Sequence, residues 1–181
     1  MDIKKYILKW EASGIVFVFL MGALLHFVFE WSGEPEIVGL FASVNESVWE
    51  HSKLTFSPML IAGIFQIFAI SPTYLNHYFA ILASVLVGIV LMPILYYFVK
   101  SITKKEILWI SITIFYIVVI SAYLVEYCML RNRTILMNYD LELISFCLIF
   151  VLILIYAVLT FAPPRLGIFK DTIKKKYGDF K

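Results

Sequence analysis

The number of membrane crossings in this chain depends on one stretch, residues 45–53, which reads Asn45-Glu46-Ser47-Val48-Trp49-Glu50-His51-Ser52-Lys53. Apolar sequence lies on both sides of it, in residues 37–44 and 54–70. Ionisable side chains in or beside a membrane span are energetically costly, and they usually serve a function. We therefore expect a polar site here, although the stretch alone identifies no activity.

The composition of the whole chain is that of an integral membrane protein. Of its 181 residues, 62% are hydrophobic and 15% are charged, with a mean hydropathy of +0.91. Soluble domains carry about 25% charged residues. The net charge of +2 does not indicate a nucleic-acid partner. The two cysteines, Cys128 and Cys147, form neither a disulfide framework nor a zinc-thiolate spacing.

Five long apolar runs predict transmembrane helices at residues 13–31, 54–70, 78–99, 107–125 and 143–162. The first run follows three lysines, but no small-residue cleavage site ends it, so we interpret it as an uncleaved helix. We expect a transmembrane domain over residues 1–168 and a basic cytoplasmic tail over residues 169–181. Basic and apolar residues alternate in this tail, which favours binding to the bilayer and its anionic headgroups.

Charge placement predicts a sixth crossing. With five crossings the N-terminal lysines and the basic tail would lie on opposite sides of the membrane, against the positive-inside rule. A crossing within residues 36–53 would leave only Arg131 and Arg133 of the 15 basic residues outside. The sequence therefore predicts an all-α bundle of six transmembrane helices, the second short or broken. Both termini would be cytoplasmic, and the polar crossing would face the bundle interior of a cell-membrane protein.

The candidate site combines carboxylates, imidazoles and an amide. Glu46 and Glu50 share one helix face, and His51 lies on the adjacent one. With the neighbouring first helix, the expected ligand-binding set is Glu11, His26, Asn45, Glu46, Glu50 and His51. Such groups hold a divalent metal ion or relay protons, and the metal ligands would be His26, Glu50 and His51.

A structural interpretation of the same residues stays open. Glu11, Glu50, His51 and Lys53 could instead form a network that pins the turn between two crossings. Asn45 and Glu46 would lie deeper in the membrane, where a function is favoured.

Two resemblances bear on function. The motif at residues 45–53, with Pro58 and the earlier Trp10, Glu11 and His26, resembles an uncharacterised family of small bacterial integral membrane proteins, which implies no activity. Ser47 and His51 are similar to the Ser-x-x-x-His element of the alkaline-ceramidase-like membrane hydrolases. Those zinc enzymes also have a late His-x-x-x-His pair, whereas this chain has no histidine after His77. No catalytic residue is therefore assigned.

Three classes of function remain. The first is a protein that binds or transports a small solute, a proton or a cation through the acidic site. The second is a metal-dependent intramembrane enzyme that uses His26, Glu50 and His51 as ligands and Glu46 as general base. The third is a subunit of a membrane complex in which the motif is an assembly surface. We rank the binding or transport protein highest, the subunit of a membrane complex next and the metal-dependent enzyme last. The sequence has no motif that identifies a protein partner or a substrate.

Overall fold

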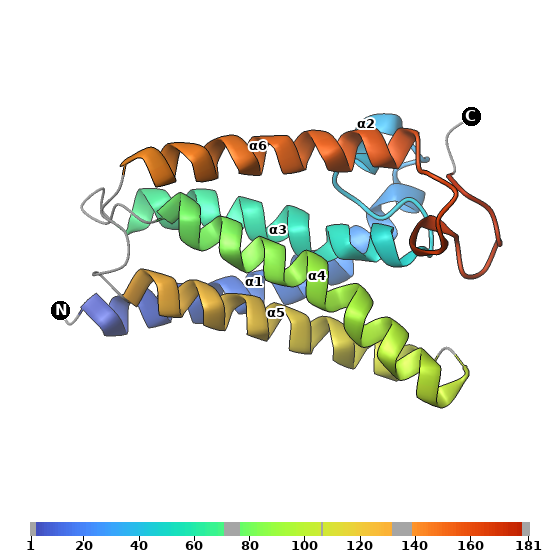
Figure 1. Ribbon diagram of the computed structural model, residues 1–181, viewed down its shortest axis with the longest axis horizontal. Helices are drawn as coiled ribbons and strands as arrows, with labels where there is room; N and C mark the ends of the chain where they lie inside the picture. Colours follow the sequence, from blue (N-terminus) through green and yellow to red (C-terminus); the bar gives the residue numbers. More distant parts are fainter. Residues whose placement is uncertain (1–2, 71–76, 106, 132–138, 179–181) are drawn as a thin grey trace.

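The computed structural model describes residues 3–70, 77–105, 107–131 and 139–178, and it is built from helices. Five long helices run back and forth along one direction (Figure 1): α1 (Ile3–Trp31), α3 (Val48–Ala69), α4 (His77–Thr103), α5 (Leu108–Arg131) and α6 (Tyr139–Phe161). Each is long and apolar enough to cross a membrane. Two short elements complete the set, α2 (Glu36–Gly39) and the 3₁₀ turn η1 (Gly167–Phe169).

The expected sixth crossing does not form. The four residues of α2 extend about 6 Å, whereas the hydrocarbon core is about 30 Å thick. The chain after α2 turns irregularly and enters α3 at Val48. Residues 36–53 thus make a turn at the end where α1 finishes, and the described ends of the chain lie at opposite ends of the bundle (Figure 1). Two termini on the same side of the membrane need an even number of crossings. The expectation that both termini are cytoplasmic therefore does not fit five alternating helices.

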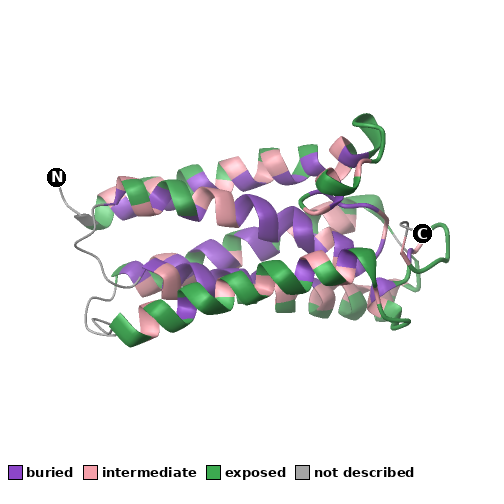
Figure 2. Ribbon diagram, turned by 90° about the horizontal axis from the view of Figure 1, so that it is seen from above, coloured by how far each residue is buried: buried purple, intermediate pink, exposed green. Residues whose placement is uncertain are grey.

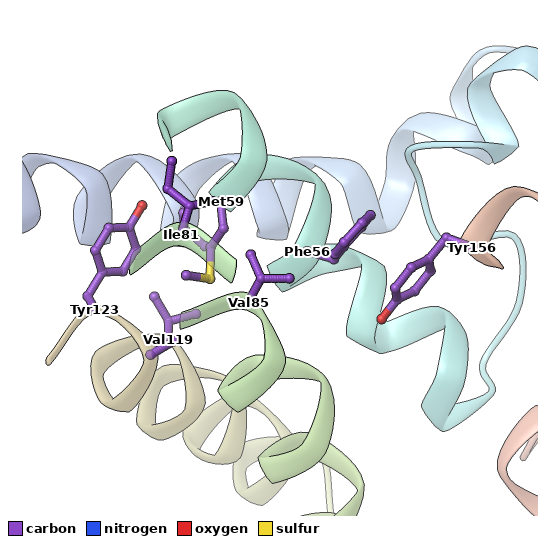
Figure 3. Close-up of a cluster of buried hydrophobic side chains, with 9 residues drawn as sticks. Phe56, Met59, Ile81, Val85, Val119, Tyr123 and Tyr156 are labelled. Atoms are coloured by element: carbon purple, nitrogen blue, oxygen red, sulfur yellow. The ribbon is translucent and has the colours of Figure 1, made fainter. Parts of the chain in front are cut away.

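Four of the helices form a closed ring. Contacts run from α1 to α3, α3 to α4, α4 to α5 and α5 back to α1, while α6 packs outside on α4. The interior cluster includes Phe56, Met59, Val85 and Val119 (Figure 3). Buried residues follow the inner faces of the helices and exposed ones the outer faces (Figure 2). Many exposed residues are large and apolar, such as Phe68 at 82% exposure, as a lipid-facing surface requires.

A glycine and a proline bring α1 close to the start of α3. Pro58 lies inside α3 and has no N–H, so the Leu54 carbonyl lacks its usual helical donor. Gly22 of α1 lies against that carbonyl, because a Cβ added there would be 2.6 Å from Leu54 O. His26 follows Gly22 by one turn on the same face of α1. The close approach therefore directs His26 toward the first turns of α3.

The segment after α6 folds back onto the start of α3. Phe169 of η1 is buried and packs on Trp49, with ring centroids 5.0 Å apart. Trp49 also stacks on Tyr156 of α6 at 4.6 Å, and Tyr156 stacks on Phe56 at 4.1 Å. This aromatic column joins η1, α3 and α6. As far as residue 178, the chain after α6 is therefore attached to the bundle beside residues 45–53.

Candidate functional site

Short polar side chains shape the turn that precedes α3. Ser47 caps the helix, because its hydroxyl accepts the Glu50 N–H at 3.2 Å. The Asn45 side chain accepts the Ser47 N–H at 2.9 Å, and the Ser43 hydroxyl donates to the Asn45 carbonyl at 2.8 Å. Such local bonds replace a regular ladder in a turn. Asn45 and Ser47 therefore hold the backbone on either side of Glu46.

A buried ion pair fixes this turn to two helices. Lys53 Nζ lies 2.5 Å from Glu50 Oε2, and the Lys53 side chain has no exposed surface. Lys53 also donates to the Gly39 carbonyl at 2.8 Å and to the Thr160 hydroxyl of α6 at 2.9 Å. Glu50 accepts the Val44 N–H at 3.0 Å. These contacts support the pinning role for Glu50 and Lys53, and they account for why both can be buried.

The remaining ionisable groups of the turn converge on one point. Glu46 Oε1 lies 3.8 Å from His26 Nε2, and Glu46 Oε2 lies 3.4 Å from His51 Nε2. The two imidazole centroids are 5.2 Å apart. One ligand atom from each of the three residues lies within 4.8 Å of the others. All three side chains are only partly exposed. The carboxylate between the imidazoles is therefore Glu46, whereas Glu50 is engaged by Lys53.

The hydrogen bonding of His51 decides which of its nitrogens can bind a cation. Its Nδ1 lies 2.8 Å from the Ser47 carbonyl, which can only accept, so Nδ1 carries a proton. In the neutral imidazole, Nε2 then presents a lone pair to the Glu46 carboxylate. Two acceptors that face each other repel unless a proton or a metal ion lies between them. A histidine whose second nitrogen donates to a carbonyl is the usual form of a metal ligand.

The chain after α6 holds the backbone of Glu46 in place. The Glu46 N–H donates to Asp171 Oδ2 at 3.3 Å, and the Thr172 N–H donates to the Glu46 carbonyl at 3.3 Å. Asp171 is 2% exposed and also accepts the N–H groups of Ile173 and Lys174. Sequence reasoning missed Asp171, because 125 positions separate it from Glu46 and no local pattern links them.

A family model matches residues 1–179, and its description is "Family of unknown function (DUF6512)". The chain belongs to this family. The resemblance to an uncharacterised family is thereby confirmed, and the match carries no activity with it. No curated protein and no solved structure matches the chain. The geometry of its side chains is therefore the basis for assigning chemistry to this DUF6512 protein.

Glu11 is not brought to this site. It precedes His26 by 15 positions on α1, which is about 22 Å along the helix axis. Glu11 instead accepts a hydrogen bond from Gln66, near the far end of α3. It would have met Glu50 and His51 only if a second crossing had carried residues 45–53 across the bundle. In the DUF6512 chain that stretch stays at the end where α1 finishes.

Proposed function

We propose that this protein is a multi-pass membrane protein that binds a divalent transition-metal cation through His26, Glu46 and His51. The observation that carries the proposal is the convergence of two imidazole nitrogens and one carboxylate on a common point. The hydrogen bond from His51 Nδ1 to the Ser47 carbonyl supports it, because it leaves Nε2 as the ligand atom.

The spacing of the ligand atoms fits a metal ion better than a shared proton. Ligand bonds of about 2.0–2.1 Å in a tetrahedral zinc site place neighbouring ligand atoms roughly 3.3 Å apart. A charge-assisted hydrogen bond would instead bring N and O to about 2.7–2.9 Å. The distances from Glu46 oxygens to the two histidines are 3.4 Å and 3.8 Å. These two distances involve different oxygens of Glu46, and one ligand atom from each residue lies within 4.8 Å of the others, so the side chains would move inward to close around an ion.

The donor set also selects the class of metal. Imidazole suits Zn²⁺, Cu²⁺, Ni²⁺ and Fe²⁺, whereas Mg²⁺ and Ca²⁺ prefer oxygen ligands throughout. Three protein ligands leave a fourth position for water or a solute. This arrangement favours a role in binding or passing a cation. Ser47 is 1% exposed and its hydroxyl caps α3, so it contributes to the structure of the turn and not to the reactive groups of a hydrolase.

We further propose that the end of the bundle with this site faces the cytoplasm. The surface cations described at that end are Lys100, Lys104, Lys105, Arg165, Lys170, Lys174, Lys175 and Lys176. Half as many are described at the other end, namely Lys4, Lys5, Lys9 and Arg131. The positive-inside rule assigns the richer end to the cytoplasm. The basic segment after α6 would then contact the anionic inner leaflet.

Metal titration of the purified protein tests the first proposal. Isothermal titration with Zn²⁺ in detergent should give one site per chain, and dialysis followed by elemental analysis should give the same ratio. Glu46→Gln should weaken binding at least about tenfold, since it removes the ligand that touches both imidazoles. Glu30→Gln is the matched control, because Glu30 is exposed and lies one turn beyond His26 on α1. Equal affinity in the wild type and in Glu46→Gln would refute the proposal.

A further inference from the structure

A second polar cluster lies inside the four-helix ring, and each helix of the ring contributes to it. Glu11 comes from α1, Gln66 from α3, Ser84 from α4 and Glu126 from α5. Their exposed fractions are between 0% and 4%. Gln66 donates to Glu11 Oε1 at 2.5 Å, and Ser84 donates to Glu126 Oε2 at 2.8 Å. Gly14 packs against Tyr123 where the antiparallel helices α1 and α5 meet, and Glu11 and Glu126 each lie about one turn from these residues toward the same end of the bundle.

The charges of this cluster do not balance if both carboxyl groups are ionised. Among the residues that the structure describes, no lysine, arginine or histidine forms an ion pair with Glu11 or Glu126. Their hydrogen-bond donors, an amide and a hydroxyl, are neutral. Glu11 Oε2 is buried and has no hydrogen-bond partner among the described residues. Two like charges in a low-dielectric interior repel strongly, and an unpartnered charged oxygen costs several kcal/mol more.

A cavity lies beside the cluster. It has a volume of about 380 Å³ and lies between α1, α3 and α5, with Ser13, Gln66 and Tyr123 as its polar lining residues. Gln66 both lines the cavity and donates to Glu11. The Tyr123 hydroxyl points toward α1 (Figure 3) and fits there because Gly14 has no side chain; a Cβ on Gly14 would be 2.6 Å from it. The cavity therefore borders the amide that holds Glu11, while most of its other lining residues are apolar.

We propose that Glu11 and Glu126 form an intramembrane proton-binding site that holds one exchangeable proton within the four-helix ring. The proton removes one of the two negative charges, and Gln66 and Ser84 orient the carboxyl groups of Glu11 and Glu126. The polar groups of the four helices at this site are Glu11 on α1, Gln66 on α3, Ser84 on α4, and Glu126 with Tyr123 on α5. This site is separate from the one at His26, and the proposal of a proton-binding site does not depend on metal binding there.

Carbodiimide labelling tests the proposal, because dicyclohexylcarbodiimide reacts with protonated carboxyl groups in apolar surroundings. The full-length protein is labelled in detergent at pH 7, and the modified peptides are mapped by mass spectrometry. Glu11 or Glu126 should be labelled at least tenfold more than exposed Glu34, and the labelling should fall as the pH is raised. Labelling no greater than that of Glu34 would overturn the proposal, as would protection by Na⁺ relative to choline, which would assign a metal cation to the pair instead.

Infrared spectroscopy supplies a second readout that does not depend on reagent access. The wild type at neutral pH should show a protonated-carboxyl carbonyl band that shifts in D₂O. The band should be absent in the double variant Glu11→Gln/Glu126→Gln, in which the amide oxygens can still accept from Gln66 and Ser84. Loss of the shift in D₂O would mean a sealed structural proton, and it would overturn the assignment as a binding site.

Discussion

Replacing Lys53 with methionine should destabilise the folded protein by about 3–5 kcal/mol, the usual cost of removing one partner from a buried ion pair. Methionine keeps most of the apolar stem of the lysine but has no charge. Glu50, with a side-chain exposure of 3%, would then be a buried carboxylate without a cation. The Gly39 carbonyl and the Thr160 hydroxyl would also lose a donor.

A double-mutant cycle separates the ion pair from general packing. Lys53→Met, Glu50→Gln and the double variant are unfolded reversibly by SDS in mixed micelles, with helix content followed by circular dichroism. The double variant should recover at least about 2 kcal/mol of the loss, because a neutral pair leaves no buried charge. Lys105→Met serves as the control, since Lys105 is exposed and should change stability by less than about 0.5 kcal/mol. A Lys53→Met protein within 1 kcal/mol of the wild type would refute this account of the turn.

Three further results are expected. Gly22→Ala should lower both stability and Zn²⁺ affinity, because the new methyl group meets the Leu54 carbonyl at 2.6 Å and moves His26 away; unfolding and metal titration measure the two effects, and an unchanged affinity would contradict the role given to that contact. Zn²⁺ affinity should fall as the pH is lowered, because an imidazole that takes up a proton loses its ligand lone pair; a pH-independent affinity would argue against histidine ligands. Asp171→Ala should release the segment after α6, because three N–H groups lose their acceptor, and limited proteolysis should then cut residues 170–176 faster while α1 stays intact.

The five long helices follow from the sequence because a membrane span has a simple requirement. About 20 consecutive apolar residues are enough to cross the hydrocarbon core, and each predicted run lies largely within one of the five long helices. The sixth crossing does not form, because the positive-inside rule was applied to both basic termini at once. The structure has four described surface cations at one end of the bundle and eight at the other, so five crossings leave only the smaller cluster on the opposite side. Lys53, which was counted with the inside cations, is paired with Glu50 within the protein.

The candidate site was predicted in part. The motif places Glu46 and His51 near each other by local spacing, and antiparallel packing of adjacent helices is enough to expect His26 beside them. The choice between Glu46 and Glu50 as the carboxylate needed the structure, because it depends on which of them Lys53 engages. Glu50 and Lys53 are three positions apart, a spacing at which side chains on a helix meet. This spacing was the sequence signal that could have indicated their ion pair. No sequence signal indicated the contact between Glu46 and Asp171.

Several partners of residues 46–53 come from the last part of the chain, which has a consequence for biosynthesis. Ser52 meets Tyr156 across 104 positions, Lys53 meets Thr160 across 107, and Glu46 meets Asp171 across 125. At about 5–20 residues per second, a ribosome needs roughly 6–25 s to add 125 residues. During that interval the polar groups of the nascent turn lack the hydrogen-bond partners that Tyr156, Thr160 and Asp171 supply later. The contacts that hold the turn of the proposed metal site are therefore completed only after α6 and residues 171–172 have been synthesised, so a chain interrupted before α6 would leave these groups open to chaperones and to quality-control proteases.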